Sequence, residues 1–133
     1  MKIHGSELKG PDGRTLPLSA AVEVDGLVYL SGQIALRDGT VGGSVAEQTD
    51  VIFAAIGSIL AEAGLTLDHI VKATIWLSDP ADFSDFNAAY TKHLNPPYPA
   101  RSCVISRLVL ANARVEIEVV ATHAGTRAQT ALR

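Results

Sequence analysis

Residues 44–64 read SVAEQTDVIFAAIGSILAEAG, and residues 71–78, a few positions further on, read VKATIWLS. Ser44 and Glu47 have the spacing of a capping box, in which each side chain bonds the other residue's backbone N–H at a helix start. Apolar residues then recur every three or four positions, and Gly64 suits the left-handed backbone that ends many helices. Residues 71–78 alternate apolar and polar side chains, as a strand does. The sequence therefore predicts a long helix followed by a strand.

The segment before this helix is typical of a hairpin. Residues 22–24 and 27–30 flank Asp25-Gly26, a dipeptide that tolerates the positive φ angles of a tight turn. A second, looser turn is expected around residues 37–39, which read RDG. Two strands are therefore expected ahead of the helix.

A second helix is predicted over about residues 82–94, with Phe83, Phe86 and Tyr90 as its buried stripe. The segment 96–99 reads PPYP and ends it, because proline disrupts a helix and restricts the residue before it. Two further strands follow at about 101–108 and 114–122. In the last strand alternate side chains face opposite ways, with Val115, Ile117 and Val119 on one side and Arg114, Glu116 and Glu118 on the other.

The resulting order is β-β-α-β-α-β-β. It predicts an α/β (α+β) fold in which a mixed sheet carries both helices on one face. The other face stays uncovered in a monomer, although it carries apolar residues as well as Glu116 and Glu118. We therefore expect a closed homo-oligomer, in which a second copy covers that face.

Length and composition favour one globular domain. The chain has 133 residues, of which 47% are hydrophobic and 19% charged, so it can build a core. We expect a single domain over residues 1–124 and a flexible tail over residues 125–133, which are small and polar without periodicity. The net charge of −3 and the pI near 5.7 argue against binding to nucleic acid or to an anionic membrane.

The location expected from the sequence is the cytoplasm. The N-terminus lacks the apolar stretch of a signal peptide, and no apolar window is long enough to span a bilayer. Cys103 is the single cysteine, so no internal disulfide can form, which fits a reducing compartment.

Common catalytic and cofactor motifs are missing. The four histidines are scattered without ligand spacing, so no metal site is expected. The glycines around residue 42 build neither of the Gly-rich phosphate-binding fingerprints, and no Gly-x-Ser-x-Gly elbow is present.

Polar residues at strand and helix edges remain as candidates. Arg101 follows a stiff proline-rich segment that fixes where its guanidinium points, and a guanidinium binds a carboxylate through two parallel hydrogen bonds. Glu116 or Glu118 can act as a general base, or both can be solvated surface charges. Taken singly, each residue also fits an ordinary surface position.

Three further candidates are weaker on their own. Ser31 precedes Gly32, where a ligand can approach the backbone closely, yet an ordinary strand end explains it as well. Asn87 is a poor helix former in the middle of a helix, although an exposed asparagine is equally consistent. Cys103 has no adjacent base in the sequence, so a small buried hydrophobe is favoured over a nucleophile.

The segments are more specific in combination. Over about residues 17–121 the sequence resembles the Rid (reactive intermediate deaminase, YjgF-like, endoribonuclease L-PSP) family. The resemblance rests mainly on PARSCV at 99–104 and VEIE at 115–118, in register with SGQ at 31–33 and FN at 86–87. It implies a chorismate-mutase-like fold assembled as a homotrimer, with three sites in the clefts between subunits.

The resemblance also implies an activity without a cofactor. Members of the family hydrolyse short-lived enamines and imines, such as 2-aminoacrylate and 2-iminopropanoate, to a 2-oxo acid and ammonia. Carried over to this sequence, Arg101 would hold the carboxylate of a small imine substrate, and the backbone N–H of Cys103 would add a donor. Glu116 would activate the attacking water, and Ser31 and Asn87 would line the pocket.

Two departures from the family pattern bear on function. Leu18 stands where many members have a tyrosine that closes over the site, and residues 108–112, LVLAN, lack the usual Leu-Pro pair. Leu18 is consistent with a more apolar imine, a weaker enzyme or another role. One alternative is therefore a non-catalytic regulator that binds a 2-oxo acid in the same cleft. A ribonuclease, a label attached to some relatives, fits poorly with the acidic pI.

Overall fold

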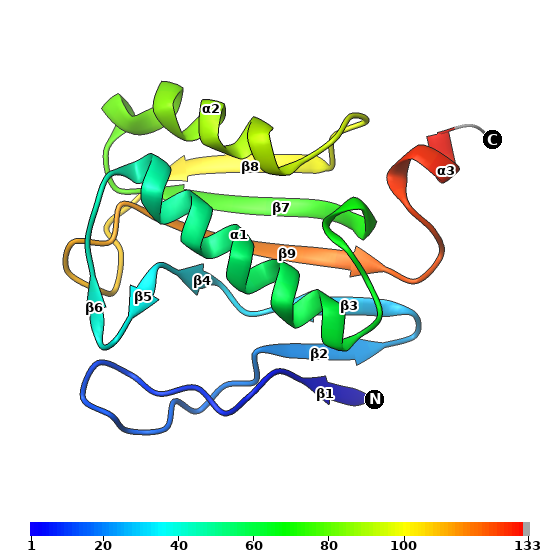
Figure 1. Cartoon of the computed structure of the whole chain (residues 1–133), viewed down its shortest axis with the longest axis horizontal. Helices are drawn as coiled ribbons and strands as arrows, with labels where there is room; N and C mark the ends of the chain where they lie inside the picture. Colours follow the sequence, from blue (N-terminus) through cyan, green and yellow to red (C-terminus); the bar gives the residue numbers. More distant parts are fainter. Residues whose placement is uncertain (132–133) are drawn as a thin grey trace.

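The computed structural model describes residues 1–131 (Figure 1). Its helices and strands follow the predicted order, with additional short elements. The bounds are β1 Lys2–His4, β2 Ala21–Val24, β3 Leu27–Leu30, β4 Gln33–Ile34, β5 Leu36–Arg37, β6 Thr40–Val41, α1 Val45–Glu62, η1 Leu67–His69, β7 Ile70–Leu77, η2 Pro80–Asp82, α2 Phe83–His93, β8 Ala100–Ile105, β9 Val115–Thr122 and α3 Arg127–Ala131.

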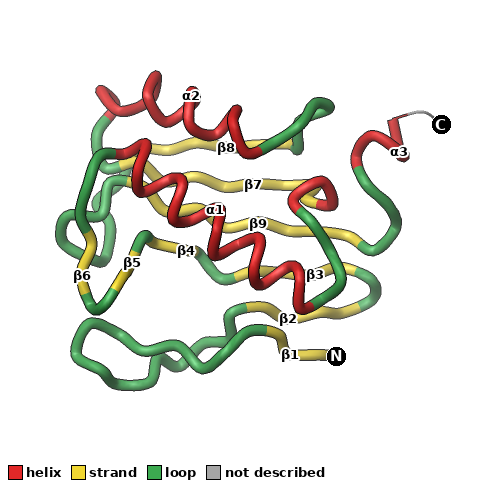
Figure 2. The backbone as a smooth tube through the Cα atoms, in the orientation of Figure 1, coloured by secondary structure: helices red, strands yellow, loops and turns green. Residues whose placement is uncertain are grey.

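The sheet is mixed, as predicted. Its strands lie in the order β1-β2-β3-β9-β7-β8, and β4 also pairs with β9. Only β7 and β8 run parallel, and α2 is the crossover that connects them. Strands β5 and β6 form a separate hairpin. Both long helices lie on the same side of the sheet (Figure 2), so the α+β prediction is confirmed.

Helix α1 begins with the predicted capping box. The Glu47 N–H donates to the Ser44 hydroxyl over 3.1 Å, and the Ser44 N–H donates to the Glu47 carboxylate over the same distance. The apolar stripe of the helix packs against the inner face of the sheet, where Ile52, Ile56 and Leu60 are fully buried. The left-handed Gly64, with φ of +76°, follows the helix end as expected.

Gln48 holds the start of α1 against the other end of the fold. Although it is polar, it is fully buried. Its side-chain amide donates to the carbonyls of Gly43 and Asn112, and its carbonyl accepts from the N–H of Arg114. All of its main hydrogen-bonding positions are therefore used, which is the condition for burying an amide without a large penalty.

The hairpin turns match the sequence prediction. Asp25 and Gly26 adopt φ values of 51° and 79°, the geometry that a two-residue turn between β2 and β3 needs. Asp38 and Gly39 do the same between β5 and β6. In β9, Val115, Ile117 and Val119 are buried beneath the helices, whereas Glu116 and Glu118 point to the opposite face.

Two expectations differ from the structure, and strand β1 is additional. Phe83 does not belong to the buried stripe of α2: it is 45% exposed at the first turn, while Phe86 and Tyr90 are buried. Strand β8 ends at Ile105 instead of residue 108, because its partner β7 ends at Leu77 and leaves later residues nothing to pair with. Strand β1 was not expected at all.

The expected tail also differs over its described part. Residues 127–131 form the short helix α3, and the Arg127 side chain is bonded to four backbone carbonyls. A single arginine with many partners leaves no periodic signal in the sequence, which is why composition alone indicated a loose end. Residues 132 and 133 lie outside the described part.

The sheet face away from the helices is open in this chain. Tyr29 on β3 is 45% exposed there, and Val104 on β8 is exposed to the same extent. No helix within residues 1–131 is long and apolar enough to cross a membrane, and no cluster of three or more metal-ligating side chains occurs among the described residues.

Candidate active site

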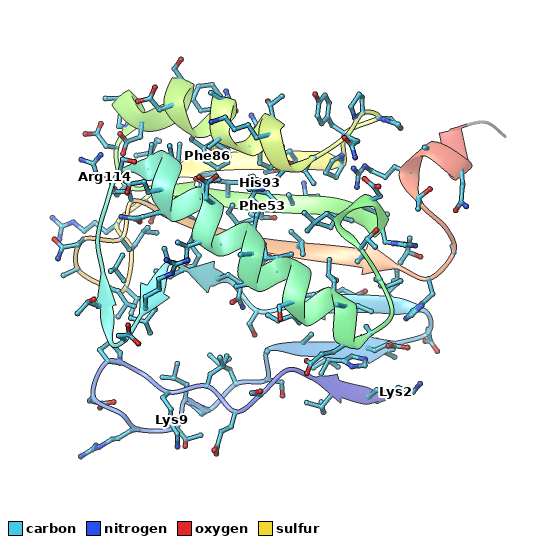
Figure 3. The ribbon with its side chains drawn as sticks, in the orientation of Figure 1. Lys2, Lys9, Phe53, Phe86, His93 and Arg114 are labelled. Atoms are coloured by element: carbon cyan, nitrogen blue, oxygen red, sulfur yellow. The ribbon has the colours of Figure 1, made fainter. Side chains whose placement is uncertain are left out.

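Arg101 is held against helix α2. It lies in the second position of β8, directly after the proline-rich segment, and its guanidinium donates to the Asn87 side-chain oxygen over 2.8 Å. The guanidinium carbon also lies 5.0 Å from the ring centre of Tyr90, with the rings of Phe83 and Phe86 slightly further away. Phe86, labelled beside α2 and β8 in Figure 3, is fully buried. The aromatic rings and Asn87 therefore restrict the guanidinium to one region.

No acidic side chain within residues 1–131 pairs with Arg101. A guanidinium has five N–H donors, and Asn87 accepts from only one nitrogen. The remaining donors are available to a planar anion, and a carboxylate fits that geometry. The structure thus brings together two of the residues predicted from the sequence, Arg101 and Asn87.

A hollow of about 330 Å³ opens beside this guanidinium. Its size is in the range that small-molecule sites occupy. Burial raises the pKa of the Tyr90 phenol above its usual value, although Arg101 opposes this, so the hydroxyl stays protonated at neutral pH. That hydroxyl is buried without a partner among the described residues. The hollow is lined by Asn87, Tyr90, Thr91, Tyr98, Pro99 and Arg101.

The thiol of Cys103 is occupied by packing, whereas its backbone N–H is free to bond. The side chain packs against the hydrophobic core, and burial raises the pKa of the thiol, so the thiol stays protonated. The N–H of Ser106 donates to β7, and N–H groups alternate in direction along a strand, so the Cys103 N–H points to the open edge of β8. This N–H is available as a donor, as the family resemblance implies.

Glu116 lies on the other face of the sheet. A Cβ atom at position 32 would collide with the Glu116 carboxylate, so any residue other than glycine would force that side chain to move. Burial raises the pKa of Glu116 above its usual value, and repulsion from Glu118 raises it further. Gly32 was expected to let a ligand approach the backbone, but here it accommodates the carboxylate instead.

Ser31 lies next to Gly32 on the same side. Its hydroxyl donates to the Ser19 carbonyl over 2.6 Å, so its proton is used and only its oxygen can accept from a ligand. Leu18, which immediately precedes Ser19, is 45% exposed. The exposed Glu118 and the Ser31–Ser19 pair border a hollow of about 420 Å³ on the open face. Ser31 thus borders the open face, which also carries Glu116, and Leu18 is the chain neighbour of its partner Ser19.

The predicted residues therefore form two groups on opposite faces of the sheet. Arg101 is aligned with the buried Ala73, whose side chain points to the helices, whereas Glu116 is aligned with Trp76 on the open face. Residues directly across neighbouring strands share a face. One small molecule cannot contact both Arg101 and Glu116 of a single chain. They can act together only when the Arg101 group of one copy meets the Glu116 group of another.

Comparison with known proteins identifies the family. The sequence profile of the family named Endoribonuclease L-PSP matches residues 13–123, which is most of the chain. The chain belongs to this family, also called Rid or YjgF. This Rid-family chain is 39% identical over 107 residues to "Protein MMF1, mitochondrial" of Saccharomyces cerevisiae, covering 79% of this chain and 74% of the relative.

Two other relatives carry more informative names. The "2-iminobutanoate/2-iminopropanoate deaminase" of Bos taurus is 38% identical over 110 residues, covering 80% of each chain. The crystal structure of E. coli TdcF with bound serine superposes with a TM-score of 0.81 at 27% identity, covering 93% of the Rid-family chain and 100% of TdcF. The mixed sheet with two helices is thus the fold of the family.

Sequence reasoning missed part of the Arg101 group. Tyr90 was assigned to the core, yet it also borders the hollow and faces the guanidinium. Tyr98 was treated only as part of a helix-ending segment, although it is 51% exposed and forms a wall of the hollow. An aromatic residue between prolines, three positions before a candidate arginine, is the signal that points to it.

Proposed function

We propose that this chain is a homotrimeric hydrolase that deaminates reactive 2-imino and enamino acids to 2-oxo acids and ammonia. The observation that carries the proposal is Arg101, which is oriented by Asn87 and aromatic rings and has no acidic partner within residues 1–131. The relative named as a 2-iminobutanoate/2-iminopropanoate deaminase supports the same chemistry.

Binding begins at the substrate carboxylate. Arg101 forms two parallel hydrogen bonds to it, and the Cys103 N–H at the open strand edge donates a third. Asn87 keeps the guanidinium in place from behind. These contacts orient the imine carbon toward the neighbouring copy, where Glu116 is located. Orientation can supply most of the rate acceleration, because an imine carbon is already electrophilic and needs little further activation.

The hydrolysis needs only water as a second reactant, so its atoms and charges balance without a cofactor. Glu116 accepts a proton from water as the water oxygen bonds to the imine carbon, giving a carbinolamine. Glu116 passes this proton to the nitrogen, which completes the neutral carbinolamine, and then accepts the proton of the carbinolamine hydroxyl. Transfer of this second proton to the nitrogen accompanies cleavage of the C–N bond, so ammonia leaves as the carbonyl of the 2-oxo acid forms. Ser31 accepts a hydrogen bond from the substrate or water at this side of the site.

The raised pKa of Glu116 suits this role. A general base works best when its pKa lies near the working pH, and an ordinary glutamate is too acidic for that. Burial together with the charge of Glu118 moves the pKa of Glu116 upward, in the useful direction. Glu118 is thus part of the tuning of the base and not a second base.

Trimeric assembly completes the site in this proposal. The two groups lie on opposite faces of one sheet, and the open face carries exposed apolar side chains such as Tyr29 and Val104. A ring of three copies joins each Arg101 group to the Glu116 group of the next copy. Sedimentation of the purified protein as a trimer is the expected result, and a stable monomer would contradict it.

A second candidate function is a regulator that binds a 2-oxo acid without turnover. Leu18 motivates it, because this side chain is exposed beside Ser19 and cannot donate a hydrogen bond to a reacting group. The Arg101 group alone is sufficient to hold a carboxylate. Tight 2-oxo acid binding in the absence of imine hydrolysis would favour this function.

Three negative expectations remain part of the proposal: no cofactor, no nucleic-acid partner and no membrane partner. The cytoplasm remains the predicted location, although the yeast relative is named as mitochondrial. Fractionation of cells that produce the tagged protein tests the location.

The decisive experiment is a coupled imine assay. An amino acid oxidase generates imines from several amino acids, and semicarbazide traps whatever escapes hydrolysis. Wild type should lower the amount of trapped product, and Arg101→Ala should not. Arg14→Ala is the matched control, because that side chain is 88% exposed and its nearest carboxylate oxygen is 3.9 Å away. Equal trapping with and without wild-type protein, for every amino acid, would rule out the deaminase.

A further inference from the structure

Arg127 ties together two loops that precede neighbouring strands. Its Nε donates to the Pro97 carbonyl over 2.6 Å, and one terminal nitrogen donates to the carbonyls of Leu67 and Ile70 over 2.8 and 2.9 Å. The other terminal nitrogen donates to the Asn95 carbonyl over 3.0 Å. The side chain is only 8% exposed. Four carbonyls on one buried guanidinium form a specific attachment point.

The segment 95–99, which we call the proline loop, depends on this attachment. Pro96, Pro97 and Pro99 have no backbone N–H, so the loop has few donors with which to hold itself in place. Asn95 adds one weak side-chain bond to Asp68, at 3.3 Å. Helix α3, which carries Arg127, lies at the same end of the sheet as this loop (Figure 1).

The proline loop forms one wall of the hollow beside Arg101. Tyr98 and Pro99 line that hollow, and the carbonyl that receives the shortest bond from Arg127 belongs to Pro97, the residue directly before Tyr98. Strand β8 starts immediately after the loop, with Arg101 as its second residue. A shift of the loop therefore moves both the Tyr98 wall and the start of the strand that carries the guanidinium.

We propose that Arg127 is a positioning residue for the substrate-binding hollow: its guanidinium fixes the proline loop and thereby the placement of Tyr98 and Arg101. This inference rests on the proposed function of the hollow as the binding half of the site. It assigns a role to a segment beyond the region matched by the family profile, which ends at residue 123. Lysine cannot replace Arg127, because a single ammonium does not reach four carbonyls in a planar fork.

The first test compares Arg127→Ala and Arg127→Lys with Gln129→Ala in the full chain. Gln129 accepts from the Thr126 N–H, so its replacement removes one side-chain hydrogen bond of the same short helix and none of the bonds made by the Arg127 guanidinium. We expect Arg127→Ala to raise KM for the imine about tenfold, with kcat within about threefold of wild type. Arg127→Lys should recover only part of the loss, and Gln129→Ala should leave KM unchanged.

A second readout does not depend on catalysis. The N–H groups of Ala100 and Ser102 point to β7, by the same alternation as Ser106, so their hydrogen exchange reports on the start of β8. Arg127→Ala should speed this exchange about tenfold while Ile117 in β9 is unaffected. Uniformly faster exchange at all three sites, or an unchanged KM together with unchanged exchange, would overturn the proposal.

The two proposals fail in different ways. If wild type hydrolyses no imine, the proposed deaminase function fails. The role of Arg127 is then decided by exchange together with calorimetric binding of pyruvate, a 2-oxo acid. Weaker pyruvate binding with faster exchange only at β8 supports positioning. Unchanged pyruvate binding by Arg127→Ala overturns it.

Discussion

The properties of Glu116 are set by its partial burial and by two close neighbours, Glu118 and Gly32. Partial burial raises the pKa of its carboxyl, the charge of Glu118 raises it further, and Gly32 leaves the space that the carboxylate occupies. None of these neighbours has to contact substrate to affect the reaction. A base of this kind is tuned by its surroundings, so changes to the surroundings should change the pH dependence more than the chemistry itself.

Replacing Glu118 by glutamine should therefore shift the pH profile of imine hydrolysis. Removal of the like charge lowers the pKa of Glu116, so the base stays deprotonated to lower pH. The acid limb of the plot of kcat/KM against pH should move to lower pH, whereas Glu116→Gln should cut kcat by a factor of about 100 or more at every pH. Steady-state assays across the pH range measure both.

The control for this pair is Glu7→Gln. Glu7 lies on the exposed N-terminal segment, where its side chain is 66% exposed. The acid limb of the pH profile of Glu7→Gln should coincide with that of wild type. An unshifted limb in Glu118→Gln would show that Glu116 does not control the profile.

Helix α1 owes its placement to a polar residue in an apolar interface. Gln48 bonds to the carbonyls of Gly43 and Asn112 and to the N–H of Arg114, which joins the helix start to the segment leading into β9. Strand β9 carries Glu116, so this connection links the most regular helix of the fold to the strand that bears the proposed base.

Gln48→Met should destabilise the protein. Methionine is of similar size but leaves two carbonyls and one N–H unpaired in the interior, which should lower the free energy of unfolding by about 2–4 kcal/mol. Denaturant unfolding at one fixed protein concentration measures the change. Ser58→Ala, at an exposed position of the same helix, should stay within about 0.5 kcal/mol of wild type. If Gln48→Met lowers the free energy of unfolding by no more than Ser58→Ala does, the structural role of Gln48 is contradicted.

In the whole molecule, the sheet lies between the Arg101 group and the Glu116 group. Arg101 lies on the helix side at the edge strand, and Glu116 lies on the open side of a central strand. In the proposed ring, each site takes Arg101 from one copy and Glu116 from the next. Two variants that are each inactive should then regain activity when their subunits mix in one trimer.

Mixed trimers of Arg101→Ala and Glu116→Gln test this arrangement. An interface is intact when a Glu116→Gln copy supplies Arg101 and the next copy, Arg101→Ala, supplies Glu116. With random mixing in equal amounts, about a quarter of the interfaces are intact, so activity should return to about a quarter of wild type. The imine assay after joint refolding measures it.

Mixtures made without subunit exchange serve as the control and should stay inactive. Activity that does not return after verified exchange would show that both residues of a site come from one chain. That result would contradict the assignment of the two groups to separate copies.

The sequence by itself determined the elements and most of their order. The capping box at Ser44, the Asp25-Gly26 turn and the alternation in residues 115–119 act through neighbours a few positions away, so they can be read without the fold. The family resemblance also singled out Arg101 and Asn87, which the structure brings together.

Only the tertiary structure decided which residues share a face and what surrounds them. The fit of Gly32 beside Glu116, the Tyr98 wall and the four carbonyls on Arg127 join positions far apart in the chain. The placement of Arg101 and Glu116 on opposite faces depends on strand order and register, as well as on side-chain alternation. Such contacts form when the sheet assembles, so no local pattern of residues encodes them.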